Sequence, residues 1–130
     1  MNSHQPIEGL VLRLTEPVSF LTIEPRSGAI TDQHHPQHGL SIRDRILMLP
    51  GTRGGSATPS QFCEMLRLGT APKAILMPEW DNPLCVGAWV AEFLYQKTIP
   101  MFLIDRLDYA CTCSGDCVRI LAASANTTAD

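Results

Sequence analysis

The sequence predicts one α/β domain in which short antiparallel strands precede a parallel half of β-α-β-α-β order. After residue 45, apolar runs of strand length alternate with stretches whose apolar residues recur at helical spacing, which is typical of a parallel sheet covered by helices. Before residue 45, the apolar runs are short and separated by turn residues, which favours antiparallel pairing. The 130 residues, 45% of them hydrophobic and 18% charged, suffice for one core, so we treat residues 1–130 as one domain.

The first part of the chain contains three short extended segments. Residues 9–14 form the first predicted strand, which ends before Pro17 because proline cannot donate to a strand ladder. Residues 18–23 are a second short strand, and Gly28 lies in a turn where a positive φ is allowed. Residues 29–31 then extend again, and we expect these segments to pair antiparallel.

The second part contains the parallel strands and their helices. The predicted parallel strands cover residues 45–49, 73–77 and 101–104, and the predicted helices cover residues 59–68 and 83–96. A last strand is predicted at residues 118–121. Right-handed crossovers place the loop after each parallel strand at the carboxyl edge of the sheet, where open α/β sheets bind ligands. The small, polar residues 122–130 are expected to fray, so the ordered core covers about residues 7–121.

Both predicted helices carry start signals. Thr58 and Gln61 have the form of a capping box, Pro59 suits the first helical position, and Gly69 ends this helix. Asn82 is expected to cap the second helix, with a proline after it. The second helix presents a face of small and apolar residues to the sheet: Leu84, Gly87, Ala88, Ala91 and Leu94.

The loop of residues 51–58 is the first functional candidate. It joins a buried strand to a helix start, and the free N–H groups of that start lie beside the guanidinium of Arg53, an arrangement that favours an anion. The loop is not a nucleotide P-loop, since no Lys follows its glycines, and Thr58 prevents a Gly-x-Ser-x-Gly frame around Ser56. Glycine-rich turns that bind nothing have a similar composition, so a purely structural turn is the alternative.

A second candidate is the histidine-rich loop of residues 32–39. Pro36 prevents the helical turn that would bring the rings of His35 and His38 together, which argues against a metal site. The imidazoles either bind loop carbonyls or contact a substrate, and both alternatives remain open.

The cysteines and the overall charge exclude several classes of protein. Cys111, Cys113 and Cys117 lack the spacing of a zinc or iron–sulfur site and have no fourth ligand nearby, so we expect this chain to bind no metal by itself. The net charge of −3 and the scattered Lys and Arg argue against nucleic acid, and no apolar run reaches the roughly 18 residues of a membrane span. The polar N-terminus and the odd number of cysteines favour a cytoplasmic chain with free thiols, binding small molecules or proteins.

Several short motifs recur in a specific order. Gly-Ala-Ile-Thr-Asp at residues 28–32 leads into His-Pro-Gln-His-Gly at residues 35–39, and Gly-Thr-Ala-Pro at residues 69–72 follows the Arg53-Gly54 pair. Spread over residues 9–120, these motifs resemble the small subunit, or swivel domain, of the aconitase X family.

The resemblance implies a swivelling β/β/α fold and a hydro-lyase subunit that is inactive without a larger partner. In this family the large subunit holds the iron–sulfur cluster, and the active site lies between the two chains. The implied reaction is dehydration of a small hydroxy carboxylate, cis-3-hydroxy-L-proline in the first reading and mevalonate 5-phosphate in the alternative. By resemblance, Arg53, Gly54 and Gly55 bind the substrate carboxylate, His35 and His38 contact the substrate, and Ser56 is the catalytic base.

The loop departs from the family pattern at the presumed base. Family members carry Arg-Gly-Ser-Ser here, so Gly55 stands where the base serine belongs and Ser56 aligns with the second serine. A serine hydroxyl ionises far above neutral pH and needs donors beside it to act as a base. Three alternatives follow: Ser56 is the base, the partner supplies it, or the chain is a repurposed, non-catalytic swivel module. Residues 20–23 also depart from the family pattern, which has an aromatic residue and two glycines there.

Overall fold

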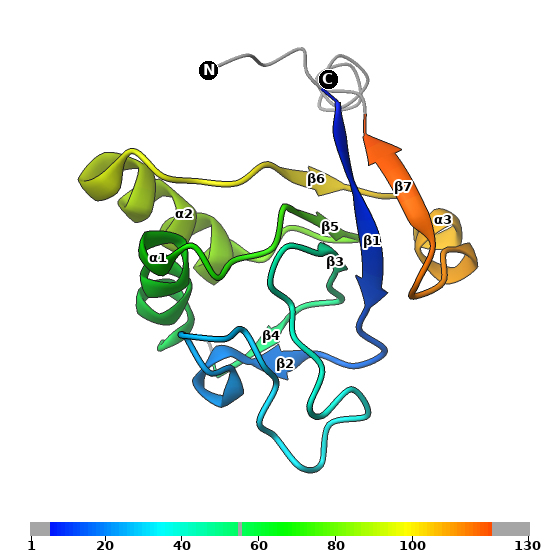
Figure 1. Ribbon diagram of the computed structural model, residues 1–130, viewed down its shortest axis with the longest axis horizontal. Helices are drawn as coiled ribbons and strands as arrows, with labels where there is room; N and C mark the ends of the chain where they lie inside the picture. Colours follow the sequence, from blue (N-terminus) through cyan, green and yellow to red (C-terminus); the bar gives the residue numbers. More distant parts are fainter. Residues whose placement is uncertain (1–5, 55, 121–130) are drawn as a thin grey trace.

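The main sheet has five strands in the order β6-β5-β3-β1-β7 (Figure 1). The protein is described by a computed structural model, which covers residues 6–54 and 56–120. The main-sheet strands are β1 (Ile7–Arg13), β3 (Ile46–Met48), β5 (Ala74–Met77), β6 (Met101–Leu103) and β7 (Cys117–Ile120). A two-stranded sheet contains β2 (Val18–Ser19) and β4 (Thr52–Arg53), and the helices are α1 (Thr58–Leu68), α2 (Asn82–Tyr95), α3 (Arg106–Cys111) and the 3-10 turn η1 (Phe20–Thr22). The α/β class with a mostly parallel sheet is confirmed.

The N-terminal strand occupies a different place from the one predicted. Strand β1 pairs parallel with β3, with Val11 opposite Ile46, and antiparallel with β7, with Ile7 opposite Ile120. Strands β2 and β4 pair parallel. The predicted antiparallel pairing survives only as isolated bridges from Ile23 to Ile30 and from Ala29 to Ser41. Local sequence shows where a strand is extended, but its partners depend on contacts distant in the chain.

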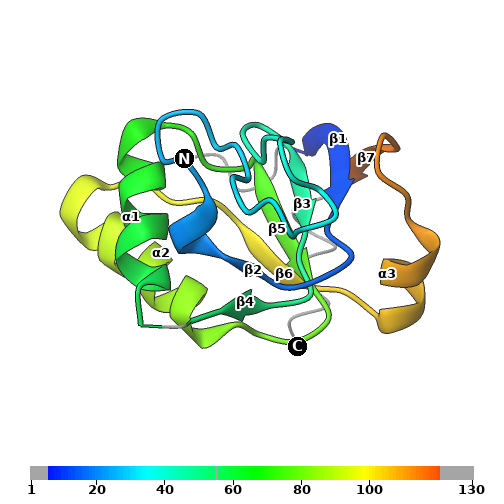
Figure 2. The ribbon, with the colours of Figure 1, turned by 90° about the horizontal axis from the view of Figure 1, so that it is seen from below.

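Each face of the main sheet has its own apolar core, because successive strand residues point to opposite faces. On one face, Leu12, Leu47 and Ile75 pack with residues of α1 and α2. On the other face, Val11 and Ile46 pack with partly buried residues that include Tyr109 of α3. Figure 2 shows α1 and α2 at one end of the molecule and α3 at the opposite end.

Helices α1 and α2 approach closely at Gly87. A Cβ added there would lie 2.7 Å from the carbonyl oxygen of Pro59, a contact that side chains do not make. Most of the predicted inner face of α2 is buried, including Leu84, Ala88 and Ala91. Leu94 is the exception, since it is 54% exposed, so the prediction that it faces the sheet is wrong.

The predicted helix caps are each displaced by one residue. The N-cap of α1 is Ala57, which makes no side-chain cap bond, so the capping box of Thr58 and Gln61 is wrong. Ala57 N–H donates to Gly54 O at 3.3 Å, and Thr58, the residue after Ala57, is buried together with its hydroxyl. Helix α2 is capped by Asp81, whose Oδ1 accepts from Leu84 N–H at 3.1 Å, and not by the predicted neighbour Asn82.

Other boundaries agree in part. Gly69 ends α1 at φ 79°, as predicted. The predicted strand 18–23 stops after Ser19, whose Oγ accepts from Leu21 N–H and caps η1. Helix α3 was not predicted; Asp105 Oδ1 caps it through Leu107 N–H at 2.7 Å. The end of the last predicted strand and the tail 122–130 lie outside the described residues.

Candidate functional site

The loop 51–58 lies where the N-terminal ends of α1 and α2 meet (Figure 2). Its first half is held in place as strand β4, in which Thr52 lies opposite Val18 and Arg53 opposite Ser19. Val18 N–H also donates to Gly51 O at 3.3 Å. The loop therefore sits on a rigid base of backbone hydrogen bonds, which is the setting in which binding residues are held in fixed geometry.

One carboxylate ties this loop to α2. Asp81 Oδ2 accepts from Thr52 N–H at 2.8 Å and from Thr52 Oγ1 at 2.7 Å, while Oδ1 caps α2. Sequence reasoning missed this contact. The signal was present, because Asp81 stands two residues before Pro83 and Asp is a strong N-cap residue.

The guanidinium of Arg53 lies at the surface beside Glu16. Arg53 Nη2 is 3.4 Å from Glu16 Oε1, and the two side chains are 55% and 49% exposed. Such an exposed pair contributes at most about 1 kcal/mol. Another anion can therefore replace Glu16 on Arg53 at little cost in free energy.

His35 is buried and both of its ring nitrogens are used within the chain. Nδ1 accepts from Gln37 N–H at 3.0 Å, so the ring proton is on Nε2, which donates to Glu16 O at 3.2 Å. The two alternatives for His35 were a hydrogen bond to a loop carbonyl and a contact with a substrate, and the structure shows the hydrogen bond to a carbonyl. His35 thereby fixes the main chain of Glu16, the residue whose carboxylate meets Arg53.

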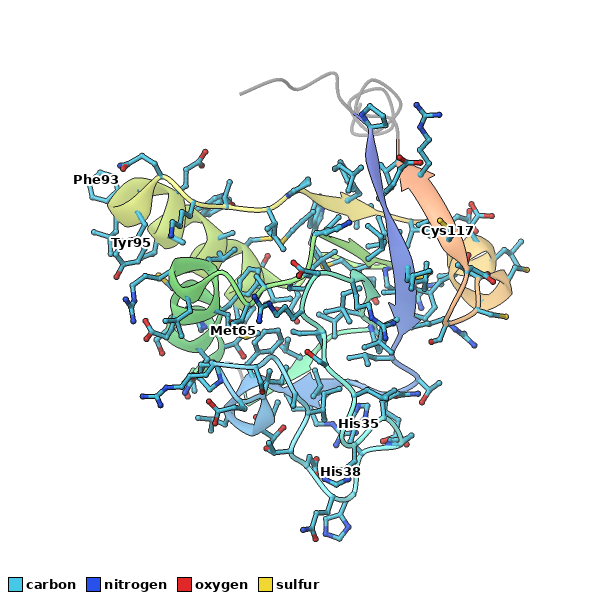
Figure 3. All side chains as sticks on the ribbon, in the orientation of Figure 1. His35, His38, Met65, Phe93, Tyr95 and Cys117 are labelled. Carbon is cyan, nitrogen blue, oxygen red and sulfur yellow. The ribbon has the colours of Figure 1, made fainter. Side chains whose placement is uncertain are left out.

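His38 lies on the same loop at the surface (Figure 3). Its N–H donates to His35 O at 3.0 Å. Within residues 6–54 and 56–120, no hydrogen bond joins its side chain to the loop 51–58. Its contact with a substrate stays a prediction.

The turn that follows Arg53 carries the candidate base. Gly54 has φ +65°, a left-handed conformation that favours glycine, and its carbonyl accepts from Ala57 N–H across the turn. Ser56 is exposed at this turn, and Gly55 lies outside the described residues. The role of Ser56 as base and of Gly54 and Gly55 in binding therefore stays a prediction.

The start of α1 offers donors to an anion. Pro59 has no N–H, and the first helical bond runs from Gln61 N–H to Ala57 O at 3.1 Å, so the amides of Thr58 and Ser60 precede the helical ladder. No side chain caps this end, which leaves the positive end of the helix dipole unscreened. Thr58 Oγ1 is buried and, in the part of the chain that the structure describes, has no hydrogen-bond partner.

Tyr109, on the face of the sheet opposite α1 and α2, binds the main chain at the carboxyl ends of β1 and β3. Its hydroxyl donates to Leu14 O at 2.6 Å and lies 3.2 Å from Met48 O. Burial raises the pKa of Tyr109 to about 12, so the phenol stays protonated even above pH 10. The tyrosine thus acts as a fixed donor, and no sequence pattern distinguished it.

The cysteines do not gather into a ligand set. Cys111, Cys113 and Cys117 are exposed free thiols. Across the described ranges, no three His, Cys, Asp or Glu side chains come close enough to hold one metal ion. Over the same ranges, no helix has the length and apolar character needed to cross a membrane.

Comparison with known proteins gives consistent matches. A family profile described as the aconitase X swivel domain matches residues 1–128. The chain is 40% identical over 87 residues to the cis-3-hydroxy-L-proline dehydratase of Pseudomonas aeruginosa, which covers 66% of this chain and 15% of that protein. It is 39% identical over 84 residues to the phosphomevalonate dehydratase small subunit of Methanothermobacter thermautotrophicus, with 64% of each chain covered.

A solved structure has the same fold. The crystal structure of Thermococcus kodakaraensis aconitase X in its holo-form matches with a TM-score of 0.77 and 30% identity, covering 93% of this chain and 87% of that chain. The matched segments span less than two thirds of the two dehydratases named above. In both of those proteins, further residues lie outside the matched part.

Proposed function

The chain belongs to the aconitase X swivel-domain family, and from this premise we propose that it is the small subunit of a dehydratase acting on a small hydroxy carboxylate. The observation that carries the proposal is the half-exposed Arg53, paired weakly with Glu16 beside the uncapped start of α1. This arrangement provides a guanidinium and backbone donors for one carboxylate. We further propose that the active site is completed by a large partner subunit.

We propose that Arg53 exchanges Glu16 for the substrate carboxylate. The backbone N–H of Ser60, which precedes the helical ladder, is a further donor for the new pair. As the proton next to the carboxylate is removed, negative charge develops on the carboxylate oxygens. Donors already aimed at those oxygens stabilise that charge without reorganising, which lowers the barrier.

The proton acceptor is assigned to Ser56, the exposed hydroxyl of the same turn. In the complete step, the base takes the α-proton, the electron pair of that C–H bond forms the new double bond, and the C–O bond breaks with its electron pair on the departing hydroxyl. The hydroxide takes a proton from solvent and is released as water. A base supplied by the partner is the alternative, because Gly55 occupies the place of the usual serine.

We assign the iron–sulfur cluster to the large subunit. This assignment follows the family resemblance. Held by the partner, the cluster would supply a Lewis acid for departure of the hydroxyl. Free thiols at all five cysteines suit a reducing compartment, and we propose the cytoplasm as the location.

The charges around the loop favour a substrate with a single negative group. Arg53 lies beside the carboxylate of Glu16, and Asp81 binds the loop at Thr52. A phosphorylated acid adds about two negative charges and would require further cations there. A cis-3-hydroxy-L-proline-like acid is therefore the first candidate, and mevalonate 5-phosphate is the second, supported by the named small-subunit relative.

The test is purification of the chain together with its large subunit, followed by assays of both candidate acids. We expect a stable complex that dehydrates cis-3-hydroxy-L-proline and leaves mevalonate 5-phosphate unchanged. Turnover of the phosphorylated acid alone would reverse the order of the two candidates. A well-formed, cluster-loaded complex that dehydrates neither acid, nor other small hydroxy acids, would contradict the proposal.

A further inference from the structure

Helix α2 is apolar on every side although only one side is covered in the described structure. Among its residues, Asn82–Tyr95, the only charged side chain is that of Glu92. The inner face packs on α1 and the sheet through Leu84, Gly87, Ala88 and Ala91. A helix that is apolar all round is normally buried all round, so the opposite face requires a cover.

We define the outer face of α2 as the exposed apolar side chains on and just before this helix. They are Trp80, Val86, Trp89, Val90, Phe93 and Leu94. Trp80 is 50% exposed, Trp89 67% and Phe93 82%. Figure 3 shows Phe93 at the outer end of α2, at the edge of the molecule.

The size of this face lies at the upper end of what a monomer usually exposes. Since an aromatic side chain presents roughly 150–250 Å² of surface, the three aromatic residues alone leave about 400 Å² open to solvent. The three aliphatic residues add to this. The sum approaches the roughly 800 Å² that each partner buries in a stable complex, whereas the largest patch on a typical monomer is about 300–600 Å².

A cavity opens beside the outer face, between α2 and the segment that leads into β6. It has a volume of about 460 Å³, and its walls include Trp80, Cys85, Trp89 and Met101. Interfaces are held mainly by side chains that fill such pockets at the centre of the contact. The cavity is therefore suited to an apolar side chain of a partner.

The outer face continues into the candidate site. It begins at Trp80, next to Asp81, whose carboxylate binds Thr52 of the loop 51–58. A protein that covers the outer face thus reaches the edge of that loop. A partner that completes the active site must lie against the same edge.

We propose that the large dehydratase subunit docks on the outer face of α2, a conclusion that rests on the proposed function. The matched segment is only 15% of one dehydratase, so in that protein it is permanently joined to the remaining residues. Permanent interfaces are more apolar than transient ones and are rich in Trp and Phe, as this face is. A second copy of this chain is the competing occupant.

The test compares two apolar-to-acidic substitutions in the full chain, co-expressed with the large subunit. Phe93→Asp introduces a charge into the outer face, and Leu107→Asp introduces the same charge on α3, at the opposite end of the molecule (Figure 2). The side chains of Phe93 and Leu107 are 82% and 75% exposed, so neither supports the fold. We expect Phe93→Asp to weaken the complex at least 100-fold by calorimetry, and Leu107→Asp to leave its Kd within about twofold of the wild type. Thermal unfolding of each isolated chain should match the wild type.

The outcomes separate this inference from the proposed function. Undiminished binding of the large subunit by Phe93→Asp, or equal losses in both variants, would overturn the docking surface. A wild-type chain that forms a dimer broken by Phe93→Asp, yet still binds the large subunit after that change, would assign the face to a second copy. A wild-type complex that is weakened by Phe93→Asp but has no dehydratase activity would support the docking surface and contradict the function.

Discussion

Asp81 binds Thr52 through two hydrogen bonds with one carboxylate oxygen, while its other oxygen caps α2. The candidate loop and the helix that carries the outer face are thus joined through a single side chain. A displacement of the start of α2 would therefore also displace Thr52. Docking and substrate binding would therefore be linked, although the two surfaces are formed by different elements.

Removal of the Asp81 carboxylate should lower the stability of the chain. We expect Asp81→Ala to lower the free energy of unfolding by about 2–3 kcal/mol, because a helix cap and two hydrogen bonds to the loop are lost. Asp81→Asn keeps an oxygen acceptor and should lose less than half of that. Urea denaturation measures the stability. Equal losses in the two variants would contradict the assigned geometry.

If the substrate replaces Glu16 on Arg53, substitutions of Arg53 and of Glu16 should have opposite effects on catalysis. Arg53→Ala should lower kcat/KM about 100-fold, since a charge-assisted hydrogen bond to the carboxylate is lost, and Arg53→Lys should recover part of it. Glu16→Gln should lower KM by up to about fivefold, because the substrate no longer displaces a bound carboxylate. Steady-state kinetics of the complex measure both. A raised KM in Glu16→Gln would show that Glu16 orients Arg53 and does not compete with the substrate.

The identity of the base can be tested at adjacent positions. If Ser56 removes the proton, Ser56→Ala should lower kcat by about 100-fold or more while the large subunit still binds. Gly55→Ser should then change kcat little. A rise of orders of magnitude in Gly55→Ser would instead show that the wild-type chain lacks its base, as the non-catalytic alternative requires. Unchanged turnover in Ser56→Ala would place the base on the partner.

Tyr109 predicts a loss of stability at high pH. Its pKa is raised to about 12 in the folded chain, against about 10 when unfolded. Its stabilising contribution is therefore complete below pH 10 and is lost as the pH rises to 12, where the folded phenol also ionises. Tyr109→Phe should cost about 1 kcal/mol at pH 7 through the lost hydrogen bond to Leu14 O. The difference between the two proteins in urea denaturation should shrink from pH 10 to pH 12, and a constant difference would contradict the assignment.

The α/β class and the order of the parallel elements could be predicted because hydrophobic spacing is a local property of the sequence. The caps could not, since their position depends on where the backbone turns. Ala57 N–H closes a turn onto Gly54 O, and this shifts the start of α1 by one residue. The position of β1 between β3 and β7 could not be predicted either, because it is set by pairing between segments that are distant in the sequence.

The candidate site was predicted in outline, from Arg53 and the small residues around it. Its details came from contacts that no local pattern contains. His35 binds the main chain of Glu16, and Asp81 binds Thr52. The outer face of α2 was also missed, because helical spacing predicts which residues can share a face but not whether a partner covers it.

The pairing of Ile7 with Ile120 has a consequence for the order in which the chain matures. Strand β1 gains the partner on its second edge only after β7 has been synthesised, and β3, β5 and β6 all lie between the two in the chain. Until then, nascent β1 presents an unsatisfied ladder that invites pairing with neighbouring chains. The edge of β1 is therefore closed only after the other strands of the main sheet have been made, and chaperone protection would matter most until β7 has emerged.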